Sequence, residues 1–152
     1  MITRDAGWVA VVVAATALAW AGFFLHNVAD LPGQTILAPE SLFPTLVWTA
    51  ALILWLVPST RATGAWVLLT WALINLVGGA ATVLPLPFLP FEPEQTATHY
   101  AFHGLYAGMQ VPLIGVTAVW LRRQGRTRSQ GRPPSDSYGA NSRTPYTPKS
   151  IR

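Results

Sequence analysis

Three histidines are the residues of this sequence best suited to chemistry, and two of them lie four positions apart. His99 and His103, at i and i+4, share one face of a helix, which is the spacing that lets two imidazoles bind one metal ion. His26 or a loop carboxylate would supply a third ligand for zinc or copper. Haem held between His26 and one of the other two histidines is a second arrangement of this kind. Structural histidines at the membrane interface, or histidines that handle protons or bind another ligand, are the alternatives.

Most other catalytic chemistry is excluded by residue type. The sequence has no cysteine, so disulfides, thiolate metal sites and cysteine nucleophiles cannot form. Ser41 and Ser59 fall at expected helix boundaries, where helix capping explains them. No Gly-x-Ser-x-Gly elbow and no glycine-rich phosphate loop is present. We therefore expect no catalytic residues and no enzyme, and an enzyme that acts on lipids through the histidines is the remaining alternative.

The elements that position these histidines are predicted to cross a membrane. Only 11% of the 152 residues are charged, whereas a soluble domain averages about 25%. Apolar segments cover about residues 7–28, 42–57, 64–84 and 98–121, and a span needs about 20 residues. The second segment approaches that length by starting at Pro39, so a short re-entrant segment is its alternative. The pattern predicts an all-α, polytopic membrane protein with a four-transmembrane-helix bundle over residues 1–121.

Charge predicts how the bundle is oriented. With four spans, all ten Lys and Arg residues, Arg61 among them, fall on the side of the two termini. The opposite side receives the acidic residues Asp30, Glu40, Glu92 and Glu94. Because Lys and Arg near span ends are retained in the cytoplasm, both termini are predicted to be cytoplasmic. With three spans, Arg61 and the basic tail would be translocated, which disfavours that topology.

Source and processing are also predicted from the pattern. Arg outnumbers Lys nine to one beside frequent Ala, Val and Gly, which is typical of a bacterial genome of high GC content. We therefore expect the bacterial plasma (inner) membrane as the location. The first segment resembles a signal peptide with a cleavage site near residues 17–19, but its apolar run continues to Leu25. We expect an uncleaved signal anchor, with cleavage as the alternative.

The connections and the tail complete the predicted organisation. The proline-rich segment 85–93 is expected to seal the outer end of the bundle or to form a lid there. Residues 122–152 are rich in Arg, Ser, Gly, Pro and Thr, and they predict a disordered basic cytoplasmic tail. The bases next to the last span are expected to stop transfer, or to bind lipid headgroups. These bases are Arg122, Arg123, Arg126 and Arg128. No nucleic-acid partner is expected, because aromatic residues are not interleaved among them.

Polar residues inside the last two spans form a predicted seam. His99, His103, Tyr106 and Gln110 follow spacings of four, three and four, and therefore lie on one stripe of a helix. Asn75 lies at a similar depth in the third span, so we expect it to pair with Gln110 by a hydrogen bond. Glycines on the same two spans are expected to pack closely against other helices. These glycines are Gly78, Gly79, Gly104, Gly108 and Gly115.

Two functions are consistent with this pattern. The first hypothesis is an accessory or assembly subunit of a larger membrane complex, without a cofactor, whose partners are membrane lipids and other membrane-protein subunits or copies of itself. The small size and the glycine-lined helix face favour it. The second hypothesis is a membrane bundle that binds a small ligand, a metal or haem at its outer face through His26, His99 and His103.

Overall fold

The structure, a computed structural model, describes residues 2–85, 87 and 95–130. Its long helices are α1 (Ile2–Asp30), α2 (Pro39–Leu56), α3 (Arg61–Ile74) and α4 (Ala97–Gln130). Directly after α3 the chain forms a π-helical turn, η1 (Asn75–Gly79), and a 3₁₀ turn, η2 (Ala80–Val83). The predicted all-α class is confirmed.

Four helical segments are long and apolar enough to cross a membrane. They are Ala6–Asp30, Pro39–Leu56, Arg61–Val83 and Ala97–Arg126. The second one begins at Pro39, three residues before the predicted segment 42–57, because the missing N–H of proline has no helical partner to lose in a first turn. The chain is therefore a multi-pass membrane protein built as a four-helix bundle.

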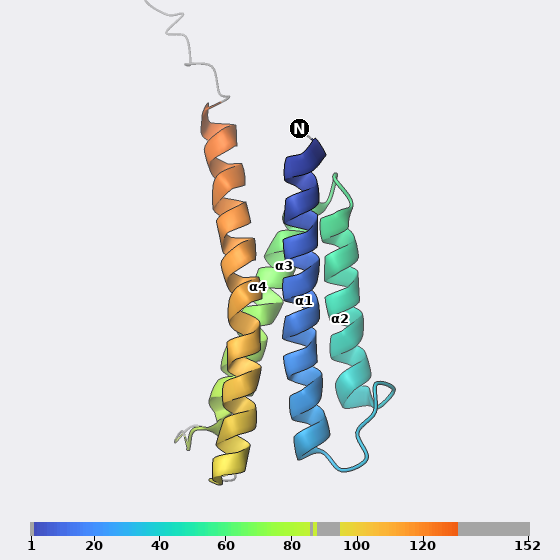
Figure 1. Cartoon of the computed structure of the whole chain (residues 1–152), viewed down its shortest axis with the longest axis vertical. Helices are drawn as coiled ribbons and strands as arrows, with labels where there is room; N and C mark the ends of the chain where they lie inside the picture. The colour runs from blue at the N-terminus through green and yellow to red at the C-terminus, as the bar shows by residue number, and fades with distance from the viewer. Residues whose placement is uncertain (1, 86, 88–94, 131–152) are drawn as a thin grey trace, which may run out of the picture.

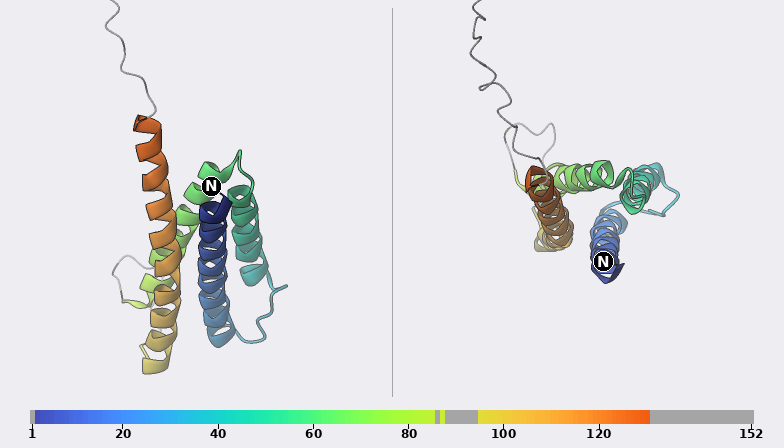
Figure 2. Two further views of the ribbon diagram at one scale, coloured as in Figure 1. Left: turned by 45° about the horizontal axis from the view of Figure 1, so that its top comes forward. Right: turned by 90° about the horizontal axis from the view of Figure 1, so that it is seen from above.

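The helices pack in the ring order α1, α2, α3, α4, with α4 closing against α1 (Figure 2). Figure 1 shows the beginning of α1 and the end of α4 at one end of the bundle, together with the turn between α2 and α3. The end of α1 and the beginning of α4 lie at the opposite end, which we call the histidine end.

The interior of the bundle combines alanines with a few large side chains such as tryptophan, and many other large apolar side chains face outward. Leu68 and Leu113 are fully buried in a cluster of alanines and tryptophans, whereas Trp66 and Val77 are more than half exposed. Small residues let helix backbones approach closely, and lipid tails accommodate the outward side chains. Gly64 shows the effect, because an added Cβ would collide with the backbone of Trp55.

The turn between α2 and α3 is short and is held by side chains. The Thr60 hydroxyl donates to the carbonyl of Leu54 at 2.7 Å, and Arg61 Nε donates to the carbonyl of Trp55 at 3.1 Å. These bonds satisfy carbonyls that the end of a helix leaves without partners. Because this connection is short, α2 and α3 are antiparallel neighbours.

Helix α4 corrects the predicted boundary between bundle and tail. It continues to Gln130, nine residues beyond the predicted end at Leu121. Arg and Gln are good helix formers, and each residue added to an existing helix gains a backbone hydrogen bond, so the loss of apolar residues does not end the helix. Residues 122–130 are therefore helical rather than part of a disordered tail.

Two sequence predictions lie outside the described residues. Because α4 extends to Gln130, the part of the predicted disordered tail that remains is residues 131–152. The predicted seal or lid at 85–93 falls almost entirely on residues 86 and 88–94. Both remain predictions.

Candidate metal centre

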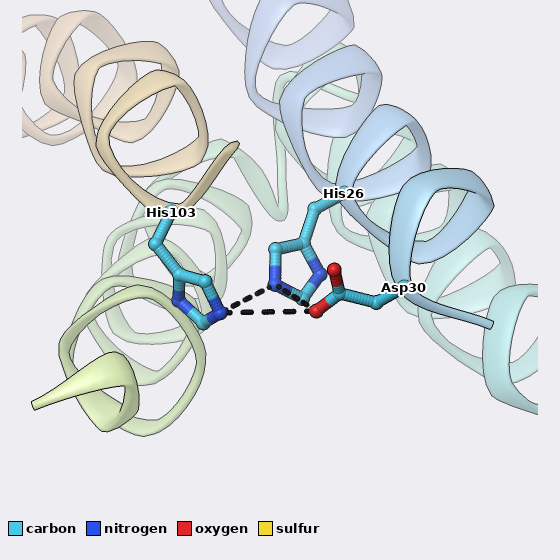
Figure 3. A group of neighbouring side chains, drawn as sticks. All are labelled: His26, Asp30 and His103. Atoms are coloured by element: carbon cyan, nitrogen blue, oxygen red, sulfur yellow. Dashed lines mark hydrogen bonds and ion pairs between the residues drawn. The ribbon is translucent and has the colours of Figure 1, made fainter. Parts of the chain in front are cut away.

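A cluster of titratable side chains lies at the histidine end of the bundle. His26 and Asp30 stand one turn apart near the end of α1, and His103 faces them from α4. Figure 3 shows the three side chains pointing toward one common point. His26 and His103 are 77 positions apart in the sequence, so only the packing of α1 on α4 brings them together.

The three side chains each offer one ligand atom to that point. His26 Nε2 lies 2.9 Å from His103 Nε2 and 3.2 Å from Asp30 Oδ2. His103 Nε2 lies 3.8 Å from the same carboxylate oxygen. The side chain of His103 is 7% exposed and that of Asp30 is 22% exposed, so the cluster is closed toward the bundle and partly open beside Asp30.

A backbone contact defines which nitrogen of His103 can bind a metal. His103 Nδ1 lies 3.0 Å from the carbonyl oxygen of Ala80 in η2. A carbonyl oxygen only accepts hydrogen bonds, so Nδ1 must carry the proton and donate. In the neutral ring, Nε2 then keeps its lone pair and directs it at His26 and Asp30. A ring N–H bonded to a backbone carbonyl is the arrangement that orients metal-binding histidines.

His99 lies beside the cluster but faces the other carboxylate oxygen. Its Nδ1 is 3.4 Å from Asp30 Oδ1, whereas Oδ2 is the oxygen near His26 and His103. The three ligand atoms that lie within 4.8 Å of one another belong to His26, Asp30 and His103. His99 is thus placed to orient the carboxylate and not to share the common point, although the sequence pattern paired it with His103 as a ligand.

The spacing of the three ligand atoms fits a transition-metal ion. In a tetrahedral zinc site with bonds of about 2.0–2.1 Å, neighbouring ligand atoms lie about 3.3 Å apart. The observed separations of 2.9, 3.2 and 3.8 Å lie on both sides of that value. Small side-chain rotations would therefore place an ion among the three atoms.

The same spacing does not fit haem. Two axial histidines must lie on opposite faces of the porphyrin, with the iron between their nitrogens. Here the two Nε2 atoms are in direct hydrogen-bond contact at 2.9 Å, and the ring planes are nearly perpendicular. No flat macrocycle can pass between nitrogens in contact, so this geometry does not suit haem held between His26 and His103.

Asp30 was not among the site residues predicted by number, although a loop carboxylate was one of the third ligands expected. The first span was predicted at 7–28, which left Asp30 in the following loop, whereas α1 continues through Asp30. His26 and Asp30 are four residues apart, the spacing used to pair His99 with His103. Extending the first helix by two residues would have revealed this pair.

The predicted polar seam is present, but its pairing differs from the prediction. The Asn75 side-chain oxygen accepts a hydrogen bond from the Tyr106 hydroxyl at 2.6 Å, and its amide donates to the carbonyl of Trp71 at 2.7 Å. Gln110 instead donates to the carbonyl of Ala19 in α1 at 3.0 Å. The predicted Asn75–Gln110 bond was wrong because similar depth does not ensure a shared face: Gln110 points toward α1 and Asn75 toward Tyr106.

The glycine predictions divide into two groups. An added Cβ on Gly79 would meet the ring of Tyr106 at 2.7 Å, so that glycine does allow a close contact. The glycines at positions 78, 104, 108 and 115 would meet nothing within 4 Å. Gly104, Gly108 and Gly115 lie on one exposed stripe of α4 that faces away from the bundle. The prediction that they pack closely against another helix is therefore wrong for the helices of this chain.

The arginines lie at the opposite end of the bundle from the cluster. Arg122, Arg123 and Arg126 are exposed on the last turns of α4, and Arg128 lies on the same helix. The Arg123 guanidinium lies over the ring of Trp8, 5.2 Å from its centre, in a cation–π contact. Binding of lipid headgroups by these four arginines stays a prediction.

The comparisons give no relative from which a role for these residues could be transferred. No protein-family model, curated protein or solved structure matches this sequence.

Proposed function

We propose that this protein binds a divalent transition-metal ion, Zn²⁺ or Cu²⁺, at the histidine end of its membrane bundle. The observation that carries the proposal is the convergence of His26 Nε2, His103 Nε2 and Asp30 Oδ2 from two helices within 4.8 Å. Two imidazoles and one carboxylate are ligands that both ions accept. The hard ions Mg²⁺ and Ca²⁺ prefer sites made of oxygen atoms.

Charge also favours a bound cation. The Asp30 carboxylate faces three imidazoles, and the arginines of the described residues lie at the other end of the bundle. A partly buried carboxylate needs a nearby positive charge or strong hydrogen bonds. A metal ion between Asp30, His26 and His103 would supply that charge and would use both histidine lone pairs.

The ligand number indicates an open site. Structural zinc sites use four protein ligands, whereas three protein ligands leave a position for water or another small ligand. The partly exposed side of Asp30 is where that position would meet solvent. The proposed centre would thus exchange a small ligand with the aqueous phase beside the membrane.

The positions of the arginines indicate on which side of the membrane the metal site lies. Arginines near span ends favour the cytoplasm, and they gather at the end of the bundle opposite the cluster. We accordingly place the metal site at the outer face of a bacterial plasma membrane, with both termini in the cytoplasm.

Metal analysis of the detergent-purified full chain tests the proposal. The chain should be stripped with a chelator, exposed to zinc, passed through a desalting column, and analysed for protein-bound zinc. We expect about one zinc per wild-type chain, and almost none for His103→Ala. His99→Ala removes a histidine that contacts Asp30 without sharing the common point, so it should lower the bound zinc less than His103→Ala does. Equal zinc in wild type and His103→Ala would contradict the proposal.

A role as an accessory subunit is the second candidate, and the open glycine stripe of α4 favours it. Gly104 and Gly108 lie four residues apart on an exposed face, where a helix from another subunit or another copy could approach closely. Co-purification in mild detergent followed by mass spectrometry tests this function. A stable partner lost in Gly104→Leu would support it, and a clean monomer would count against it.

A further inference from the structure

The third span changes its helical type next to the proposed metal site. The regular helix α3 ends at Ile74, and the π turn η1 and the 3₁₀ turn η2 follow it to Val83. Single π turns inside α-helices are rare and frequently mark functional sites. Here the irregular segment contacts α4 at two residues that lie three positions apart, His103 and Tyr106.

Both contacts are specific and buried. Ala80 is the first residue of η2, and its carbonyl accepts a hydrogen bond from His103 Nδ1 at 3.0 Å. Asn75, the first residue of η1, accepts the Tyr106 hydroxyl at 2.6 Å. Tyr106 is 3% exposed, and its ring lies beside that of His26, with centroids 5.1 Å apart. One irregular segment thus holds one metal-ligand candidate directly and supports a ring that packs on the other.

Two adjacent glycines show how closely this segment fits. Gly79 lies against the Tyr106 ring, where an added Cβ would come within 2.7 Å of a ring carbon and 2.9 Å of the hydroxyl oxygen. An added Cβ on Gly78 would meet nothing within 4 Å. Glycine is therefore required at position 79 by the approach of Tyr106, while position 78 has room for a side chain.

We infer that η1, η2 and Tyr106 form a positioning device for the metal site. The device holds the His103 ring so that Nδ1–H faces the Ala80 carbonyl and the Nε2 lone pair faces the ion. Tyr106, anchored by Asn75 and seated on Gly79, sets how closely this segment approaches α4. Gly79 and Tyr106 are positioning residues, since neither offers an atom to the common point of the three ligands. This inference rests on the proposed metal binding.

The paired glycines provide a sharp test. Full-length wild type, Gly79→Ala and Gly78→Ala should be stripped of metal and titrated with Cu²⁺ in detergent, with affinity and the electron paramagnetic resonance (EPR) spectrum recorded. Outer-shell changes typically weaken metal binding about 10–100-fold, and we expect this loss with an altered copper spectrum for Gly79→Ala. Gly78→Ala should keep the wild-type affinity and spectrum. Wild-type behaviour of Gly79→Ala would overturn the inference.

A second variant decides the result if Gly79→Ala does not fold. Tyr106→Phe keeps the ring but removes the hydroxyl that bonds to Asn75. We expect an affinity loss near the lower end of that range, about tenfold, with a shifted copper spectrum. An unchanged affinity and spectrum would overturn the inference. If wild type binds no copper, the proposed function itself fails, and that result is separate from a wild type that binds and variants that bind equally well.

Discussion

His26 Nε2 and His103 Nε2 lie 2.9 Å apart and join the end of α1 to the beginning of α4. Without a metal, one N–H must bridge the two nitrogens, because two lone pairs in contact repel each other. With a metal, both lone pairs bind the ion, and Asp30 completes a set of three ligands. An ion at this point would therefore act as a cross-link between two helices that are distant in sequence.

Metal binding should stabilise the bundle. A ligand that binds only the folded state at a free concentration about 100 times its Kd adds about 2.7 kcal/mol to the free energy of unfolding. Thermal unfolding in detergent should therefore show a Tm several degrees higher with zinc than with a chelator. His103→Ala should have the same Tm in both conditions. An equal zinc-dependent rise in that variant would place the ion elsewhere.

The Asp30 carboxylate should be required for tight binding. Asp30→Asn keeps the size of the side chain but removes the negative charge near the two Nε2 atoms. We expect zinc affinity to fall at least about tenfold, because a neutral amide is a poorer ligand for a divalent transition metal. Glu40→Gln is the matched control, since it removes a carboxylate from the same end of the bundle. Competition with a zinc-chelating dye measures both, and equal affinities for the two variants would refute the role of Asp30.

Acid should weaken metal binding. Imidazole binds a metal only through a free lone pair, so protons compete with the ion for His26 and His103. Zinc affinity should therefore be higher at about pH 7.5 than at about pH 5, and the zinc-dependent rise in Tm should shrink in the same direction. An affinity that is independent of pH over this range would exclude histidine ligands.

Gln110 should be structural and separate from the metal site. It is fully buried, its amide donates to Ala19, and among the described residues its side-chain oxygen has no hydrogen-bond partner. Gln110→Leu fills similar space without the unsatisfied oxygen, so we expect a stability change within about 1 kcal/mol. Gln110→Ala leaves a cavity and should cost about 2–4 kcal/mol. Both variants should bind zinc as wild type does. A loss of zinc binding in Gln110→Leu would show that Gln110 contributes to the metal site.

The orientation can be read with single cysteines, because the natural chain has none. Leu37 and Ser59 are exposed at opposite ends of α2, so Leu37→Cys and Ser59→Cys form a matched pair. A membrane-impermeant thiol reagent should label Leu37→Cys in intact cells, and Ser59→Cys only after permeabilisation. The reverse pattern would place the histidine end in the cytoplasm.

The sequence allowed the helices to be predicted better than their contacts. Apolar runs and the positions of Lys and Arg predicted four spans, because both follow directly from the cost of burying charge in lipid. The end of α4 was missed because helix propagation does not depend on apolar residues, as Arg122 and its neighbours show.

The candidate site was likewise predictable in its position along the helices but not in its side-chain contacts. Depth in the membrane indicated that His26 and His103 belong to one end, but not that their rings touch, since a contact depends on which faces of α1 and α4 pack together. The same limit led to the wrong Asn75–Gln110 pairing. The π turn at Asn75–Gly79, whose Asn75 accepts the Tyr106 hydroxyl, has no sequence signal beyond its two adjacent glycines.

X-ray absorption spectroscopy of the zinc-loaded full chain is the decisive measurement for the metal site, because it reports the atoms bound to the ion. We expect zinc bound by two imidazoles and a carboxylate oxygen at about 2.0–2.1 Å, with one further light-atom ligand from water. The same measurement on His99→Ala should still show two imidazoles, because His99 is not a ligand, whereas His103→Ala should lose the bound zinc. A spectrum with three imidazoles, or one that His103→Ala leaves intact, would contradict the proposed site.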